Sequence, residues 1–183
     1  MTGKLFVIAG PTAVGKGTVV NFIRQQESNL HLSISATTRA PRPGEVDGQS
    51  YFFISHEKFD QLISEDQMLE YAVVHGVNKY GTPRKPIEEA LARGENVILE
   101  IDLQGARQVK QSMPEAVTIF IAPPNWDELV RRLTLRGTES ADEQAKRLET
   151  ARLELAAQSE FDHVVINDDV ARCAAEVVEL IQA

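Results

Sequence analysis

The chain has 183 residues, which is enough for one well-buried domain with inserted segments but short for two domains. Its 19 basic and 27 acidic side chains give a net charge of −8, which argues against a general nucleic-acid binder or a polybasic membrane-surface protein. A local cluster of cations could still bind a small anion. The single cysteine excludes an internal disulfide, and no apolar stretch is long enough for a signal peptide or a membrane span. We therefore expect a cytoplasmic protein without nucleic-acid or membrane partners, and the composition does not predict its oligomeric state.

Apolar runs of strand length alternate with longer helical patterns along the chain. Runs that are apolar on both faces are typical of central parallel strands covered by helices. The predicted strands are 5–9, 97–101, 118–122 and 164–166. The predicted helices are 18–26, 103–113, 126–136, 141–157 and 170–181. This alternation predicts the α/β fold class, with a parallel sheet core flanked by helices.

The stretch from residue 33 to residue 82 interrupts this alternation. It contains turn-forming Pro and Gly residues, two short strand-like segments at 50–54 and 69–75, and one short helical segment at 57–64. We predict a β-rich insertion in the parallel core here, and a second insertion near residues 136–138, between two helices.

A glycine-rich segment follows the first predicted strand and opens the first predicted helix, which is the context that a phosphate-binding P-loop requires. Its glycines let the backbone wrap a phosphate, and the helix N-terminus adds a partial positive charge. Lys16 would reach the phosphates, and Thr18 would hold Mg²⁺ although Gly17 separates it from the lysine. A chance glycine-rich turn is the alternative interpretation. The predicted nucleotide-binding residues are Gly10, Pro11, Thr12, Ala13, Val14, Gly15, Lys16, Gly17 and Thr18.

Two acidic residues, Glu100 and Asp102, lie at the end of the strand predicted at 97–101. Ligands in open α/β sheets bind at the carboxyl ends of strands, so these acids are candidates for handling a metal beside the P-loop. Asp102 could instead cap the following helix. That explanation fits Glu100 less well, because a carboxylate in an apolar run is costly to bury without a partner.

A second anion site is predicted in the β-rich insertion. Arg39 and Arg42 are three residues apart in a segment fixed by Pro41 and Pro43, and arginine forks suit phosphate oxygens. Tyr51 and Tyr80 add hydroxyl donors in the same insertion. A solvated loop is the alternative interpretation, but a phosphoryl-transfer enzyme needs a site for the acceptor as well as for the donor.

Taken together, these motifs make the chain resemble the guanylate kinases, in family order and over almost the whole length. The matching segments are Gly10–Thr12, Ser35–Glu45, Asp47–Phe53, Glu70–Ala72, Tyr80–Thr82, Asp102–Gly105, Ile121–Pro124, Leu133–Thr138 and Asn167–Asp169. The run from Ser35 to Tyr51 is specific to this family, whereas the P-loop alone is not. The departures are Ala13 in place of a common glycine, Glu100 in place of a common aspartate, and the position of Gly17 before Thr18.

The resemblance implies a guanylate kinase that transfers the γ-phosphoryl group of ATP to GMP, with Mg²⁺ as cofactor. Arg39, Arg42, Tyr51 and Tyr80 would bind the GMP phosphate. Glu70 would read guanine, with Ser35, Thr82 and Asp102 beside it. Guanine presents two adjacent donors that a carboxylate accepts together, and adenine offers no such pair. Taken singly, Glu70 could be a solvent-facing strand carboxylate, and Thr82 could cap the helix that follows Pro83.

The resemblance also assigns the ATP side of the site. Lys16 and Arg39, with the lid arginines Arg132, Arg136 and Arg147, would stabilise charge on the transferring phosphoryl group. Asn167 and Asp168 would line the adenine side, and Thr18 and Glu100 would handle the metal. The implied organisation is a P-loop core at 1–34, 83–126 and 160–183, a GMP-binding insertion at 35–82 and a helical lid at 127–159.

Two rival functions remain at this point. A related kinase for a different phosphorylated sugar or nucleotide would keep the P-loop and change the base readers, whereas Glu70 and Ser35 are present. A non-catalytic guanylate-kinase-like binding module would typically lack an intact phosphate loop, whereas Lys16 is present.

Overall fold

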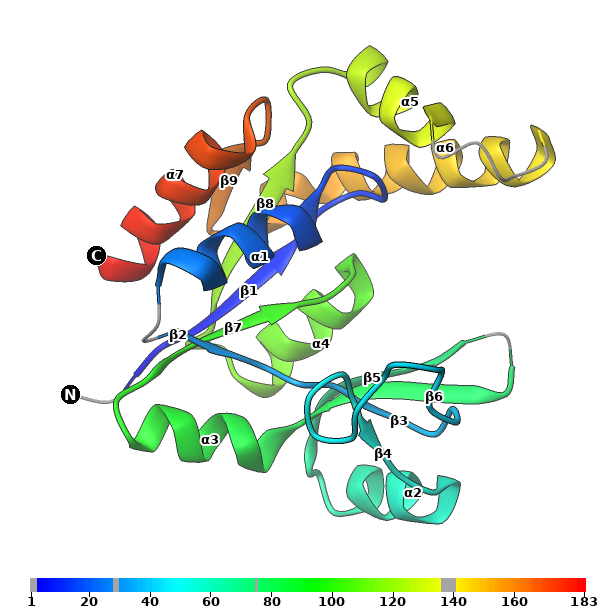
Figure 1. Ribbon diagram of the computed structural model, residues 1–183, viewed down its shortest axis with the longest axis vertical. Helices are drawn as coiled ribbons and strands as arrows, with labels where there is room; N and C mark the ends of the chain where they lie inside the picture. The colour runs from blue at the N-terminus through cyan, green and yellow to red at the C-terminus, as the bar shows by residue number, and fades with distance from the viewer. Residues whose placement is uncertain (1–2, 28–29, 75, 136–140) are drawn as a thin grey trace.

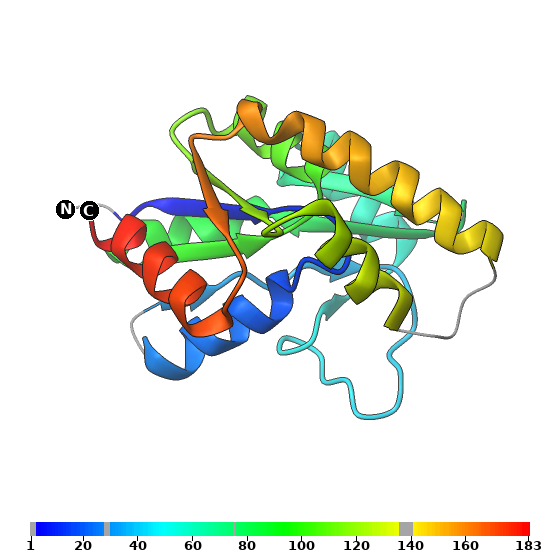
Figure 2. The same cartoon turned by 90° about the horizontal axis from the view of Figure 1, so that it is seen from above.

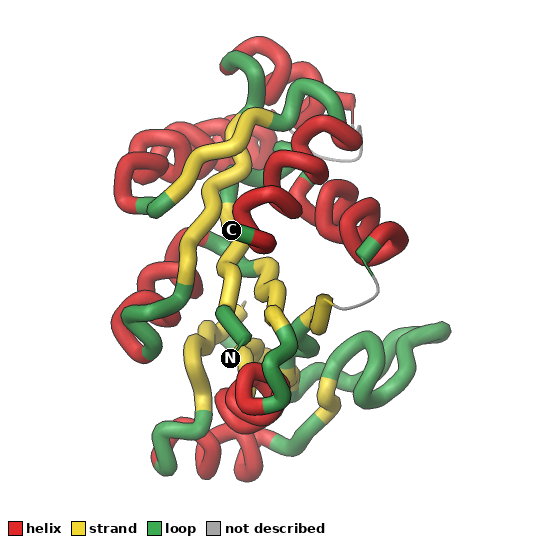
Figure 3. Tube along the Cα trace, turned by 90° about the vertical axis from the view of Figure 1, so that its left-hand side faces the viewer, coloured by secondary structure: helices red, strands yellow, loops and turns green. Residues whose placement is uncertain are grey.

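The computed structural model describes residues 3–27, 30–74, 76–135 and 141–183. Its centre is a parallel five-stranded sheet with the strand order β2-β7-β1-β8-β9. Helices lie on both sides of this sheet, and Figure 3 shows the strands as a central layer between them. The strands are β1 (Leu5–Ala9), β2 (Leu30–Leu32), β7 (Asn96–Glu100), β8 (Val117–Ala122) and β9 (His163–Ile166).

Both faces of the central strand β1 are buried, because its side chains alternate between two hydrophobic cores. Phe6 and Ile8 join a core formed with α1 (Lys16–Gln26) and α7 (Val170–Gln182), which lie side by side (Figure 2). Leu5, Val7 and Ala9 join a second core formed with α3 (Arg84–Ala92) and α4 (Leu103–Ser112). Burial on both faces is the reason why this strand reads as one continuous apolar run.

A second, smaller sheet forms from the segment predicted as a β-rich insertion. Its strand order is β4-β3-β6-β5, and the helix α2 (His56–Ser64) packs on it through Phe59. The strands are β3 (Ala36–Thr37), β4 (Phe52–Phe53), β5 (Met68–Val74) and β6 (Asn78–Pro83). In Figure 1 this smaller sheet lies below the loop between β1 and α1. The helices α5 (Trp126–Leu135) and α6 (Ala141–Ala156) lie above the same loop.

The strands and helices predicted from the sequence are confirmed, with shifts of one or two residues at their ends. The sequence missed β2, β3, β6 and α3, and the strand expected at 50–54 is only two residues long. The short strands have too few side chains to show an alternating apolar pattern in the sequence. Their formation therefore depends on pairing with neighbouring strands. Among the described residues, no helix is long and apolar enough to cross a membrane.

Candidate active site

The P-loop connects the end of β1 to the start of α1, and two of its glycines are required by close contacts. Gly15, the N-cap of α1, has φ 95°, and a Cβ there would lie 2.7 Å from Asn167 Nδ2. At Gly10 a Cβ would lie 2.3 Å from the carbonyl oxygen of Ile121. Ala13 adopts φ 65°, a left-handed conformation that costs energy for a residue with a side chain. The departure from glycine at this position therefore has a conformational cost.

The P-loop surrounds a cavity of about 450 Å³. Lys16 Nζ donates hydrogen bonds to the carbonyl oxygens of Gly10 at 2.6 Å and Pro11 at 3.2 Å, so the lysine is folded against its own loop. The lysine charge and the N-terminus of α1 together favour the binding of a polyphosphate in this cavity. The lining residues are Pro11, Thr12, Ala13, Gly15, Lys16, Gly17, Thr18, Asn21 and Glu100.

Two oxygen-bearing side chains predicted to handle a metal lie on this cavity. Thr18 is in the first turn of α1, and Glu100 is the last residue of β7. Glu100 remains exposed at the strand end, so the buried position suggested by its apolar neighbours is not what the structure shows. Partial desolvation by the loop still raises the pKa of Glu100, while the Lys16 charge opposes that shift. Hydroxyl and carboxylate oxygens suit Mg²⁺ when substrate phosphates complete its coordination. Within the described ranges, no cluster of three His, Cys, Asp or Glu residues could hold a metal.

The carbonyl oxygen of Val14, in the middle of the P-loop, is held by two predicted site residues. Asn167 Nδ2 donates to it at 2.8 Å and Arg132 donates at 3.2 Å, and Arg132 also donates to the Asn167 carbonyl oxygen at 3.1 Å. Asn167 is only 2% exposed. Both side chains therefore brace the loop backbone. Asp168, by contrast, is exposed and accepts a 2.9 Å hydrogen bond from Arg172.

In the smaller sheet, Glu70 and Thr82 are paired across β5 and β6 and both are buried. The Thr82 hydroxyl donates to Glu70 Oε1 at 2.6 Å, so it does not serve as a helix cap. A Cβ on Gly105 would lie 3.2 Å from Glu70 Oε2 and 3.3 Å from Asp102 Oδ1, which places both carboxylates against the start of α4. Burial raises the pKa of Glu70, the Thr82 hydrogen bond opposes this, and the nearby Asp102 charge adds to the rise.

Asp102 also caps α4, as the alternative interpretation of the sequence predicted. Its side chain accepts a 2.8 Å hydrogen bond from the Gly105 N–H at the start of this helix. Ser35 precedes β3, where Ala36 pairs with Gly81 in β6. The antiparallel register continued by one residue brings Ser35 alongside Thr82. The four residues predicted to surround a purine base are thus near one another.

The residues predicted to bind the acceptor phosphate gather around Arg39. Arg39 Nε donates to the Tyr80 hydroxyl at 3.1 Å, and its guanidinium carbon lies 5.6 Å from the centre of the Tyr51 ring. Glu45 accepts two hydrogen bonds from the Arg39 fork, each at 2.9 Å, and a third at 2.7 Å from the Arg42 backbone N–H. These contacts lower the pKa of Glu45 to about 2 and raise the pKa of Arg39. The fork is held in one orientation beside a tyrosine hydroxyl.

Two further predicted cations have exposed side chains and do not line the P-loop cavity. The side chains of Arg42 and Arg147 are exposed, on the loop before β4 and on α6 respectively. Arg136 lies outside the described residues. The structure therefore gathers the predicted P-loop residues at one cavity and the predicted purine-binding residues at the smaller sheet, and Arg147 lies exposed on α6.

Three residues with contacts in this region were not singled out by the sequence. Asn21 lines the P-loop cavity, Glu45 holds Arg39, and Glu154 of α6 accepts a 3.2 Å hydrogen bond from the Thr12 N–H. Glu154 could have been noticed in the sequence, because it lies with Ala151 and Leu155 on the apolar side of a predicted helix, where a carboxylate is unexpected. For Glu45 the available signal was its place at the end of the family motif Ser35–Glu45, although an acidic residue in an exposed loop is otherwise common.

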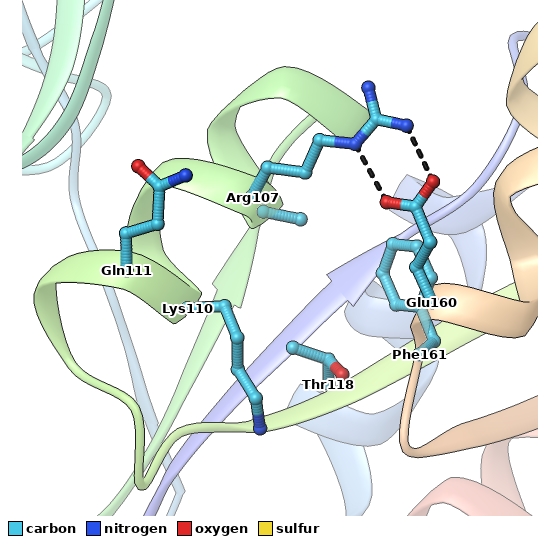
Figure 4. A pocket seen from close by; sticks show the side chains of 7 residues that line it. Arg107, Lys110, Gln111, Thr118, Glu160 and Phe161 are labelled. Carbon is cyan, nitrogen blue, oxygen red and sulfur yellow. Dashed lines mark hydrogen bonds and ion pairs between the residues drawn. The ribbon is translucent and has the colours of Figure 1, made fainter.

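A separate cavity of about 360 Å³ lies between α4, β8 and the 3-10 turn η1 (Ala157–Glu160). Figure 4 shows Arg107 and Glu160 joined by two hydrogen bonds at its rim, at 2.6 and 2.7 Å. Lys110, also on the rim, is paired with Asp162 at 2.9 Å. Because both cations are already neutralised by carboxylates, this cavity lacks the free positive charge of an anion site.

The sequence and the fold were compared with known proteins. The family model described as guanylate kinase matches residues 2–183. The chain is 62% identical to a guanylate kinase of Leifsonia xyli subsp. xyli, over 96% of this chain and 69% of that protein. It is 53% identical to a guanylate kinase of Corynebacterium jeikeium, over 99% and 97% of the two chains.

Among solved structures, the guanylate kinase from Anaplasma phagocytophilum aligns with a TM-score of 0.75 at 33% identity, covering 99% of this chain and 85% of that one. A shikimate kinase from Bacteroides thetaiotaomicron, at 15% identity, aligns with a TM-score of 0.52 over 98% of this chain and 99% of that one, and shares the fold alone. On the strength of the full-length family match and of relatives more than half identical over nearly its whole length, this chain belongs to the guanylate kinase family.

Proposed function

We infer that this protein transfers the γ-phosphoryl group of ATP to GMP, giving ADP and GDP. Family membership supports this activity. The observation that carries it in the structure is the pairing of a P-loop cavity with a buried carboxylate, Glu70, held by the Thr82 hydroxyl at 2.6 Å. One site fits a polyphosphate and the other fits a base with two adjacent donors.

The guanine site consists of Ser35, Glu70, Thr82 and Asp102. Each carboxylate oxygen can accept more than one hydrogen bond, so Glu70 can accept from the guanine N1–H and exocyclic amino group while Oε1 keeps its bond to Thr82. Adenine presents an unprotonated ring nitrogen at the same place, so a bound AMP would leave the buried carboxylate facing an acceptor. A site built on buried hydrogen bonds rejects such an analogue strongly.

The GMP phosphate is bound by Arg39, Arg42, Tyr51 and Tyr80. Glu45 and Tyr80 hold the Arg39 guanidinium before substrate arrives, which reduces the entropy that phosphate binding costs. The exposed Arg42 side chain can turn toward the same phosphate. This group of side chains makes up the acceptor part of the insertion at 35–82.

The ATP phosphates are bound by residues 10–18, with Asn167 and Asp168 on the adenine side. Thr18 and Glu100 would hold Mg²⁺ together with the phosphates, and the ion would supply charge neutralisation for the phosphoryl group there. Lys16 is held against the Gly10 and Pro11 carbonyl oxygens and contacts the phosphate oxygens from that position. The loop amides and the helix N-terminus supply further positive potential.

The transferring phosphoryl group accumulates charge that Lys16, Arg39, Arg132, Arg136 and Arg147 stabilise. Arg147 is exposed on α6, and we propose that the lid at 127–159 closes on the core at 1–34, 83–126 and 160–183 and brings this arginine to the phosphates. Closure excludes water, which would otherwise accept the phosphoryl group from ATP.

We further propose that the protein works in the cytoplasm without a nucleic-acid or membrane partner.

A coupled assay of ADP release, with ATP and each of GMP, AMP, CMP and UMP, tests this function. We expect turnover with GMP at least about 100-fold above turnover with AMP. Equal or greater activity with AMP would overturn the guanine assignment. Tight peptide binding with no turnover on any acceptor would favour a non-catalytic binding module instead.

A further inference from the structure

Glu154 is a buried carboxylate of α6 to which the proposed reaction gives no role. Its side chain is 9% exposed, and Oε2 accepts a 3.2 Å hydrogen bond from the backbone N–H of Thr12, near the start of the P-loop. The contact joins residues 142 positions apart in the sequence. Burying a carboxylate is costly unless hydrogen bonds or an opposite charge compensate it, so the position of Glu154 needs a physical reason.

The Thr12 N–H and the Pro11 carbonyl belong to one planar peptide unit and point in opposite directions. Glu154 holds the N–H side of that unit. On the other side, the Pro11 carbonyl oxygen accepts hydrogen bonds from Lys16 Nζ at 3.2 Å and from the Val14 N–H at 3.3 Å. Rotation of this peptide would therefore break the Glu154 contact and the Lys16 contact together.

Glu154 also lies where α6 changes from an exposed helix to a packed one. The described side chains from Lys146 to Thr150 are exposed or half-buried, whereas Ala151 and Glu154 are buried and Leu155 packs against the core beside α1 and α7. Figures 1 and 2 show α6 extending from this packed end past the edge of the sheet. The hydrogen bond to Thr12 thus ties the P-loop to the fixed end of the helix that carries Arg147.

We propose that Glu154 is a positioning residue, which orients the Pro11–Thr12 peptide and through it Lys16, and which joins the P-loop to α6. This proposal rests on the proposed function, because it assigns Lys16 to the ATP phosphates. Burial raises the pKa of Glu154, whereas the hydrogen bond from Thr12 and the Lys16 charge oppose this rise and the Asp102 charge adds to it, so the carboxylate and the lysine also interact electrostatically. The hydrogen bond to the peptide, rather than the charge, is the decisive contact.

The test compares Glu154→Ala, Glu154→Gln and the control Glu149→Ala, which alters an exposed glutamate of the same helix. The glutamine keeps a carbonyl oxygen that can accept from Thr12, and the alanine does not. For Glu154→Ala we expect about a tenfold loss of ADP affinity in calorimetry and about a tenfold loss of kcat, the effect of one hydrogen bond in a buried site. Glu154→Gln and Glu149→Ala should stay within about twofold of the unmodified protein on both measures.

GMP affinity, measured in the same way, should be unchanged in all three variants because the contact lies outside the smaller sheet. Unchanged ADP affinity in Glu154→Ala would overturn the proposal, and so would a loss in Glu154→Gln as large as in the alanine variant. Equal losses of ADP and GMP affinity, with a lowered melting temperature, would make Glu154 a general stability residue and overturn it as well. ADP binding is read without turnover, so an unmodified protein that binds ADP but fails to phosphorylate GMP would refute the proposed function separately.

Discussion

The Thr82 hydroxyl and the Glu70 carboxylate form a 2.6 Å hydrogen bond inside the smaller sheet, where Thr82 is fully buried and Glu70 is 8% exposed. A hydroxyl rotates freely, so this bond does more to fix the carboxylate than to fix the threonine. It occupies Oε1 and leaves Oε2 beside Gly105 and Asp102. We therefore expect selectivity for guanine to depend on the pairing of β5 with β6 and on Asp102 at the start of α4.

Replacing Glu70 by Gln should raise the KM for GMP by about 100-fold or more, because an amide nitrogen would face guanine donors. The KM for ATP should change by less than about twofold, since the P-loop is a separate site. Steady-state kinetics with each substrate varied in turn measures both values. Equal losses for the two substrates would show that Glu70 supports the fold rather than the base.

The pKa of Glu70 predicts the acid limb of the pH profile. The proposed contact with guanine needs the ionised carboxylate, so kcat/KM for GMP should fall as pH decreases through the raised pKa, above the usual carboxyl value of about 4.3. The folded protein holds this proton more tightly than the unfolded chain. The contribution of Glu70 to the free energy of unfolding should therefore decrease as pH rises from the unfolded value through the folded one.

Titration of stability and activity in Glu70→Gln provides the check. The variant lacks the ionisable group, so the slope assigned to Glu70 should disappear from its stability curve. An unchanged slope would mean that another group titrates in that range.

Substitution of Glu45 by Ala should raise the KM for GMP by about tenfold, because Arg39 then loses the carboxylate that holds its fork. With its pKa held at about 2 in the folded protein, Glu45 stabilises the loop at neutral pH, and this contribution is lost as pH falls from the unfolded carboxyl value of about 4.3 through about 2. GMP titration by calorimetry checks the affinity, and Glu57→Ala on exposed α2 is the matched control. An affinity equal to that of the control would show that Arg39 needs no support.

Removing the Asn167 side chain should destabilise the P-loop. Asn167→Ala loses the 2.8 Å hydrogen bond to the Val14 carbonyl oxygen in a buried position, and we expect a loss of about 2 kcal/mol in the free energy of unfolding. Asp168→Asn alters an exposed neighbour and should cost less than about 1 kcal/mol. Urea denaturation of both variants measures the difference, and similar values for the two would refute the bracing role.

The strained residue in the P-loop predicts a stabilising change. Ala13 has φ 65°, so Ala13→Gly should relieve the left-handed strain and raise the free energy of unfolding by about 0.5 to 1 kcal/mol, after the entropy that glycine adds to the unfolded chain. Thermal denaturation measures this gain. A lower melting temperature would show that the Ala13 methyl group, which packs beside the core, contributes more than the strain costs.

Local pattern was enough for much of this protein. The apolar run at 5–9 has strand length and burial on both faces, and the segment from Gly10 to Thr18 combines turn residues, a lysine and a helix start, so both could be read without knowing distant contacts. The insertion at 33–82 was visible as turn chemistry that interrupts the βα alternation. The family motifs extended the prediction to Glu70 and Arg39, whose roles no local periodicity could have indicated.

Tertiary contacts decided the rest, because they join residues that local pattern cannot relate. The short strand β2 is defined by its pairing with β7, and β3 by its pairing with β4 and β6. Thr82 could equally have capped a helix until strand pairing placed it opposite Glu70. The tie between Glu154 and Thr12 spans most of the chain, since a side chain reveals its partner only when folding brings the two within hydrogen-bond distance.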